Sequence, residues 1–177
     1  MSTEKDEYFM RLALSQARHA QDLGEIPVGA VIVDDTGAVI AVGCNRTVID
    51  NDPSAHAEIV ALRQAGALLN TYRLTDLTMY VTLEPCCMCS GSLIHARLKR
   101  VVFGAKDPKT GACGSVFNVL IDPRHNHKLE VVSGVLEDEC STLLKNFFKM
   151  RRNMQKNGRD WILERGMSRF WEKTAKN

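Results

Sequence analysis

The sequence has no apolar run long enough to span a membrane, because a transmembrane helix needs roughly 20 consecutive apolar residues. The amino terminus is polar and acidic, so we do not expect a signal peptide or a transit peptide. Internal repeats and linker-like stretches are also missing. These absences favour a soluble cytoplasmic protein, and 177 residues with 45% hydrophobic content can bury a sizeable core.

A disulfide framework is missing too. The six cysteines are spread over a long chain that can fold without cross-links, which is typical of a reducing cytoplasm. Only Cys86 and Cys89 form a C-x-x-C motif, and no second motif supplies the four ligands of a structural zinc site. A thioredoxin-like redox pair would be expected just after a first strand, whereas this pair lies near the middle of the chain.

Cys86 and Cys89 are three residues apart at the start of a predicted helix, so their thiols lie on one face. Pro85 precedes them and suits a helix start. Pairing of Cys87 with Cys89 is the alternative, but residues two apart point to different sides of a helix, and we expect Cys87 to be a buried free thiol. His56 would complete three protein ligands, leaving the fourth tetrahedral position to water, as in a catalytic zinc site.

Glu58 lies two residues after His56, in reach of that water. The order H-x-E followed by P-C-x-x-C is the signature of zinc-dependent nucleobase deaminases. Zinc lowers the pKa of bound water to about 7. We expect Glu58 to take the water's proton, give it to the ring nitrogen and help ammonia leave. A carboxylate that only stabilises the helix start is the alternative.

The hydrophobic periodicity predicts helices over residues 6–23, 56–65, 86–95 and 136–150, and strands over residues 28–33, 39–43, 77–83, 100–103 and 129–133. Ser54 or Asp52 is expected to cap the second helix, and Gly66 to end it. A hairpin followed by strand–helix alternation predicts an α/β fold with a mixed sheet of about five strands between helices. Both metal-motif helices should then start at one edge of the sheet.

The net charge of +2 is unevenly distributed. Residues 151–177 contain eight Lys or Arg and three Asp or Glu, a net +5, whereas residues 1–150 contain fifteen and eighteen, a net −3. A basic end on an acidic body indicates a polyanionic partner, with a solvated tail as the alternative. We expect a zinc-dependent deaminase domain over residues 1–152 and a basic extension over residues 153–177.

Two further groups suit a nucleic-acid substrate. Asn45 follows an apolar strand and is a candidate for hydrogen-bonding the substrate's ring or ribose; a turn residue with an unusual backbone angle is the alternative. Near the end of the last helix, Phe147 and Phe148 precede Arg151 and Arg152, a combination that suits base stacking with phosphate contact. The phenylalanines could instead belong to the core.

Several segments resemble the bacterial tRNA-specific adenosine deaminases of the cytidine and deoxycytidylate deaminase superfamily. They are EIPVGAV at 25–31, AHAEI at 55–59, TLEPCCMC at 82–89, RVVFGA at 100–105 and KTG at 109–111. The similarity runs from about Tyr8 to Arg152. Departures from the family's pattern are Pro108, Cys87 and residues 161–177.

The resemblance implies a three-layer α/β/α cytidine-deaminase-like fold, a homodimer with one Zn²⁺ per chain, and hydrolysis of the wobble adenosine of a tRNA anticodon to inosine. It implies zinc ligation by His56, Cys86 and Cys89 and proton transfer by Glu58. It places Asn45 in the adenosine pocket. It also implies RNA contacts from Asp107, in the loop with Lys106 and Lys109, and from the segment that holds Phe148, Arg151 and Arg152.

Two other functions fit part of the pattern. A deaminase of a free base, nucleoside or nucleotide, of guanine or cytosine type, would use the same zinc chemistry, and only the basic end and the resemblance favour RNA. The second is a non-catalytic zinc module for nucleic-acid binding. Such a module would have no use for Glu58, and its zinc would have a fourth protein ligand, so both features argue against it.

Overall fold

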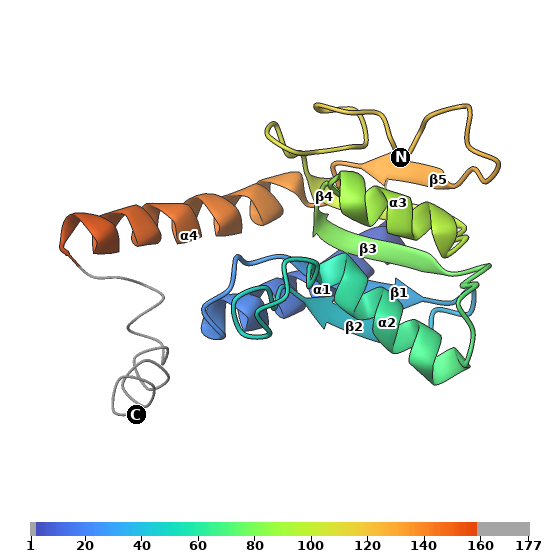
Figure 1. Ribbon diagram of the computed structural model, residues 1–177, viewed down its shortest axis with the longest axis horizontal. Helices are drawn as coiled ribbons and strands as arrows, with labels where there is room; N and C mark the ends of the chain where they lie inside the picture. Colours follow the sequence, from blue (N-terminus) through green and yellow to red (C-terminus); the bar gives the residue numbers. More distant parts are fainter. Residues whose placement is uncertain (1–2, 159–177) are drawn as a thin grey trace, which may run out of the picture.

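The computed structural model describes residues 3–158 and shows a five-stranded sheet between two layers of helices (Figure 1). The elements are α1 (Glu4–Asp22), β1 (Gly29–Val33), β2 (Val39–Cys44), α2 (Ala57–Leu69), β3 (Thr78–Leu83), α3 (Cys87–His95), β4 (Arg100–Ala105), β5 (Glu130–Ser133) and α4 (Glu137–Lys156). The predicted α/β/α fold with a mixed five-stranded sheet is confirmed. No helix within the described range is both long and apolar enough to cross a membrane.

The strand order is β2-β1-β3-β4-β5. β1 is antiparallel to β2 and to β3, whereas β3, β4 and β5 run parallel. Gly29 at the start of β1 therefore lies opposite Cys44 at the end of β2, and Leu83 lies opposite Ala105 where β3 and β4 end. The residues that flank these four strand ends meet at one edge of the sheet, where a crevice is usual.

Each face of the sheet has its own core. Helices α2 and α3 cover one face, and α1 and α4 pack on the other. Neighbouring strand residues alternate between the two cores, as Ile32 and Val31 do on β1. At Gly43 on β2 a Cβ would collide with the α2 backbone at Ala57 and Ala61, so this glycine lets α2 lie close to the sheet and fixes the start of that helix.

Two details of α2 differ from the prediction. Gly66 does not end the helix, which continues to Leu69 before Asn70 adopts a left-handed conformation with φ 51°. One interior glycine costs only about 1 kcal/mol relative to alanine, and asparagine can take the left-handed capping position. Ser54 and Asp52 do not cap the helix, because the Ser54 amide and hydroxyl both donate to Asp52 within the preceding turn.

Helix α4 is longer than predicted and runs past the domain boundary expected at residue 152. No residue of α4 after Phe147 is buried, and this end projects away from the body (Figure 1). Residues 159–177, which hold most of the predicted basic extension, lie outside the described residues. The division into a domain and an extension therefore stays a prediction.

On the sheet face covered by α1, the buried carboxylate of Asp6 joins three elements. It accepts hydrogen bonds from the Tyr80 hydroxyl at 2.9 Å and from two Arg100 nitrogens at 2.7 and 3.1 Å. It also closes a capping box with Thr3 at the start of α1. Burial alone would raise the pKa of Asp6, but the hydrogen bonds from Arg100, Thr3 and Tyr80 outweigh it and lower the pKa to about 2.

Candidate active site

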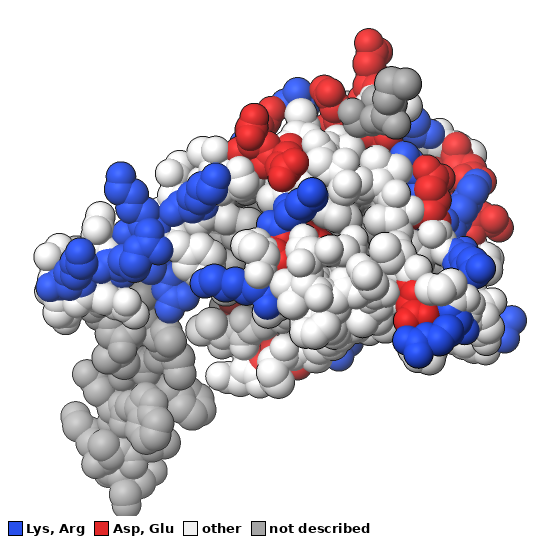
Figure 2. All heavy atoms as spheres, turned by 90° about the horizontal axis from the view of Figure 1, so that it is seen from above, with Lys and Arg blue, Asp and Glu red and all other residues white. Residues whose placement is uncertain are grey.

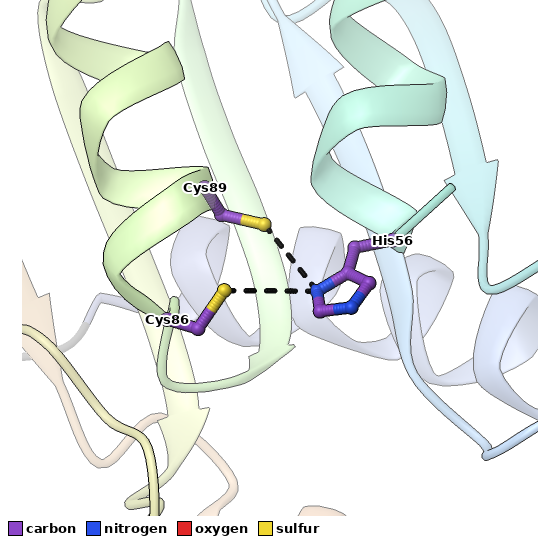
Figure 3. Close-up of side chains that lie close together, drawn as sticks. All are labelled: His56, Cys86 and Cys89. Carbon is purple, nitrogen blue, oxygen red and sulfur yellow. Dashed lines mark hydrogen bonds between the residues drawn. The ribbon is translucent and has the colours of Figure 1, made fainter. Parts of the chain in front are cut away.

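The three predicted metal ligands come together from two helix starts. His56 is the N-cap residue of α2, Cys86 is the N-cap residue of α3, and Cys89 lies in the first turn of α3. His56 Nδ1 is 3.7 Å from Cys86 Sγ and 3.6 Å from Cys89 Sγ (Figure 3). Within residues 3–158 this is the only group of three or more histidine, cysteine or acidic side chains placed to hold a metal ion.

The spacing of these atoms fits zinc. A tetrahedral zinc ion with Zn–N of about 2.0–2.1 Å and Zn–S of about 2.3 Å separates a nitrogen from a sulfur ligand by about 3.6 Å. The two measured separations, 3.7 and 3.6 Å, agree with this value. The donor set of one imidazole and two thiols is also one that zinc prefers. The geometry therefore fits a three-ligand zinc site without rearrangement.

The start of α3 differs from the prediction by one residue. Cys86 is the capping residue rather than part of the first turn, and Pro85 precedes the cap. The prediction that Cys87 is buried is wrong, because its side chain is exposed. Successive helix residues point about 100° apart, so Cys87 turns to solvent while Cys86 and Cys89 face His56.

The surroundings of the centre shift the pKa values of its thiols and of Glu58. Hydrogen bonds from Cys89 and His56 together lower the pKa of the Cys86 thiol to about 4 against the effect of burial, and the same contact with Cys86 raises the pKa of the Cys89 thiol. The thiolate is the form that binds metal. Glu58 is only 4% exposed, and burial raises its pKa to about 6. A carboxyl group with such a pKa can both take up and release a proton near neutral pH.

A cavity of about 590 Å³ opens at the sheet edge above this centre. Its inner end is lined by His56, Glu58 and Cys86, and further lining comes from strand ends that include Asn45 and Glu84. The rest, which we call the cationic wall, consists of two segments. They are the 106–110 part of the loop after β4 and the α4 side chains Ser141, Leu144, Lys145, Phe148 and Arg152.

Asn45 lines the cavity and also contacts the start of α2, next to His56. Its side-chain oxygen accepts the backbone N–H of Ala57 at 2.9 Å, so it satisfies a free donor at the start of α2. Asn45 is buried and does not have a positive φ, so the alternative of a turn residue with an unusual backbone angle is wrong. Its predicted contact with the substrate stays a prediction.

The predicted RNA-contacting residues reach the cavity, with the exception of Arg151. Lys106, Asp107 and Lys109 line it from the loop. The Asp107 carboxylate also accepts the backbone N–H of Lys109 and the hydroxyl of Thr110, so it shapes its own loop.

On α4, Phe148 and Arg152 line the cavity, whereas Phe147 is buried in the body. Arg151 is absent from the lining and lies over the Phe147 ring at 5.8 Å.

Two charged residues that line this cavity, Lys145 and Glu84, were not predicted from the sequence. Lys145 lies three residues before Phe148 and seven before Arg152, so helical spacing could have placed it on the same face. Glu84 lies just before Cys86, and its hydrogen-bond partners belong to a loop more than twenty residues later, so these contacts could not be predicted from the sequence.

Known proteins with similar sequences agree with this site. The family model of the cytidine and deoxycytidylate deaminase zinc-binding region matches residues 3–105. The tRNA-specific adenosine deaminase of Haemophilus influenzae is 54% identical over 154 residues, which cover 87% of this chain and 89% of that protein.

Known structures are similar as well. One comes from a study of A-to-I editing by tRNA:A34 deaminases at the wobble position of transfer RNA. It has a TM-score of 0.74 and 45% identity over 77% of this chain and 99% of that one. Guanine deaminase from Nitrosomonas europaea has a TM-score of 0.67 and 28% identity over 83% of this chain and 85% of that one.

The family model covers more than half of the chain, including the segments that carry His56, Cys86 and Cys89. Together with the geometry of these side chains, the match identifies a zinc enzyme with one Zn²⁺ per chain. The chain belongs to the cytidine and deoxycytidylate deaminase family and, within it, to the tRNA-specific adenosine deaminases.

Proposed function

We propose that this protein hydrolyses the wobble adenosine of a tRNA anticodon to inosine and releases ammonia. The observation that carries the proposal is a single cavity in which a zinc site and a buried glutamate face a wall rich in lysine and arginine. The relatives named tRNA-specific adenosine deaminase support the same reaction.

At the inner end of the cavity, His56, Cys86 and Cys89 would hold Zn²⁺. When bound, zinc lowers the pKa of a water molecule and so supplies a nucleophile near neutral pH. Glu58 accepts the water's proton, delivers it to the adenine ring nitrogen, and then assists protonation of the departing ammonia. Its burial at the start of α2 raises its pKa toward neutrality.

The cationic wall supports an RNA substrate. Lys106, Lys109, Lys145 and Arg152 line the cavity. Figure 2 shows Lys and Arg side chains gathered over the projecting end of α4, where the helix also carries Lys149, Arg151 and Lys156. Such a surface attracts phosphates. Phe148 is 39% exposed and lines the cavity, where its ring can stack on an unpaired base.

A single-stranded anticodon loop suits a cavity with the zinc site at one end. A base inside a duplex must be unstacked and unpaired before it can enter such a site, which takes a few kcal/mol, and the cost is smallest in a loop. The runner-up is deamination of a free base, supported by the similarity to a guanine deaminase. A free base has no phosphates, so it gives no reason for four cations around the cavity.

A homodimer is part of the proposal. A second, wider groove of about 800 Å³ lies between α2 and α3. Tyr72, which lines this groove, is 74% exposed, and Leu68 on α2 is 66% exposed, a degree of apolar exposure that a second copy of the chain would bury. Analytical ultracentrifugation should then give twice the mass of the chain, and a monomer at micromolar concentration would contradict the homodimer.

A cytoplasmic location is also part of the proposal. The sequence has six cysteines in a chain that can fold without cross-links, which is typical of a protein in a reducing compartment.

The function is tested with purified protein and an anticodon stem-loop RNA. We expect ammonia release together with conversion of the wobble adenosine to inosine, and no release from a matched stem-loop with guanosine at that position. Turnover of free guanine, cytosine or a nucleoside without turnover of the stem-loop would replace this function with the runner-up.

A further inference from the structure

Glu84 is a buried carboxylate that the proposed chemistry does not use. It follows β3, two residues before the zinc ligand Cys86, and only 2% of its surface is exposed. Among residues 3–158 it forms no ion pair with lysine or arginine within 4 Å. A buried carboxylate without a cation needs several hydrogen-bond donors to remain stable. The residues that supply these donors show which part of the molecule Glu84 stabilises.

All four donors to Glu84 come from one loop. The backbone N–H of Asp107 donates to Oε2 at 3.0 Å, and the N–H groups of Cys113 and Ser115 donate to Oε1 at 2.9 and 3.1 Å. The Ser115 hydroxyl also donates to Oε2. These partners span the 106–115 loop from its second residue to its last. Glu84 therefore holds the start and the end of the loop at one carboxylate.

The same loop is joined to the zinc motif by its backbone. Ala112 N–H donates to the Pro85 carbonyl at 2.8 Å, and Gly111 forms an isolated bridge with Cys86. A Cβ at Gly111 would lie 2.5 Å from the Glu84 carboxylate and 2.6 Å from the Asp107 carbonyl, so only glycine allows the loop to lie this close. The 106–115 loop thus rests on the three residues 84–86.

The opposite side of the loop faces the cavity. Lys106, Asp107, Lys109 and their neighbours Pro108 and Thr110 line it, and all of them except the half-buried Asp107 are exposed. Exposed side chains of a loop have little packing to hold them in place. The contacts to residues 84–86 on the inner side are therefore what sets the distance between these cations and the zinc site.

We propose that Glu84 is a positioning residue that holds the 106–115 loop on the segment bearing Cys86, so that Lys106 and Lys109 meet the substrate's phosphates while the base reaches the zinc site. This inference rests on the proposed function, because it assigns the loop an RNA backbone. It predicts that the carboxylate at residue 84 determines substrate binding more than the chemical step.

The sharpest test is Glu84→Gln. The side chain keeps its size but has one acceptor oxygen, and its NH₂ group would face N–H donors of the loop. Zinc ligands and Glu58 are unchanged. We expect KM for an anticodon stem-loop to rise roughly 10-fold, as the loss of about 1.4 kcal/mol of binding free energy would give. We expect kcat to stay within a few-fold and zinc to remain at one per chain.

Two further variants separate a positioning effect of Glu84 from a general folding defect. Ser115→Ala removes one donor from an exposed residue, so it should fold normally and raise KM in the same direction by a smaller factor. Asp6→Asn is the matched control, because it also alters a buried carboxylate with several donors, but none of its partners Thr3, Tyr80 and Arg100 lines the cavity. Its KM should equal that of the wild type.

A second readout needs no RNA. Amide hydrogen exchange at Asp107, Cys113 and Ser115 should accelerate in Glu84→Gln and remain slow in Asp6→Asn. An unchanged KM, unchanged exchange at these amides, or loss of zinc from Glu84→Gln would overturn the positioning role. If the wild type itself fails to deaminate the stem-loop, the proposed function fails instead, and the exchange rates alone then decide whether Glu84 holds the loop.

Discussion

The zinc-binding end of the cavity and the cationic wall opposite it differ in burial and in origin. His56, Glu58, Cys86 and Cys89 sit at the starts of two helices that pack on one face of the sheet, and Glu58 and Cys89 are buried. The cationic wall is exposed and is assembled from a loop and from α4, which packs on the other face.

This difference separates two kinds of requirement. Bond making at a metal tolerates little displacement, so the ligands are fixed by helix starts and by close packing such as that at Gly43. Contact with a flexible polyanion tolerates displacement, so exposed lysines and arginines suffice. Changes at the zinc end should therefore abolish turnover, whereas changes in the cationic wall should weaken binding.

The largest effect is expected from loss of a zinc ligand. Cys86→Ala should lose zinc and all measurable deamination, because two protein ligands remain where a catalytic site needs three. Cys87→Ala, one residue away and exposed, is the control and should keep both. Zinc content by atomic emission and ammonia release measure the outcome. Zinc loss in Cys87→Ala with Cys86→Ala intact would mean that the wrong thiol has been assigned.

The next largest effect is expected at Glu58. Glu58→Ala should keep zinc and the fold but reduce kcat by about 10²–10⁴-fold, the range typical of a general acid–base group. The stem-loop should still bind, because the cationic wall is unaltered. Single-turnover rates and a binding titration separate the two quantities. Zinc loss from this variant would show that Glu58 is a zinc ligand rather than a proton-transfer group.

A smaller effect is expected in the cationic wall, and α4 offers a matched pair for it. Arg152→Ala should reduce the slope of log K against log salt by roughly 0.7–0.9, as one phosphate contact is lost. Arg151→Ala should change it much less, since Arg151 lies over Phe147 and does not line the cavity. Stem-loop binding from low to moderate salt gives both slopes. Equal slopes for the two variants would contradict the inference that Arg152 faces the RNA and Arg151 does not.

The smallest effect on function is expected at Asp6, on the sheet face away from the zinc site. Its pKa is lowered from the ordinary 3.8 to about 2, so its stabilising effect is present above about pH 4 and is lost as pH falls toward 2. Asp6→Asn should lower the free energy of unfolding by about 2 kcal/mol at neutral pH, and the difference from wild type should shrink between pH 4 and pH 2. Denaturant unfolding across this range tests it; a difference that stays constant would exclude the ion pair as its cause.

The same contrast explains what the sequence could predict. The candidate zinc ligands lie in two short motifs with characteristic spacing, so the group that the structure brings together could be proposed before the fold was known, whereas the role of Glu58 stays a prediction. The sheet was predictable because its strands are rich in β-branched residues, as in the Val-Ile-Val run that ends β1. Gly66 misled the prediction of the end of α2, because a glycine inside a packed helix is only mildly unfavourable.

The cationic wall was harder to predict because it depends on tertiary structure. Charge and aromatic content could not tell Phe147, which is buried, from Phe148, which lines the cavity, although they are adjacent. The role of Glu84 could not be predicted, since its partners lie more than twenty residues away and are mainly backbone N–H groups, which every sequence contains.

The two faces of α4 have a consequence for how the chain can diverge. Phe147 anchors the helix in the body, while Lys145, Phe148 and Arg152 share the side that meets the cavity. Each residue advances an α-helix by about 100°, so one residue inserted after Phe147 would turn Phe148 and Arg152 away from the cavity while leaving the anchor in place. Related chains can therefore vary in composition along this helix, but insertions and deletions are acceptable only beyond Arg152.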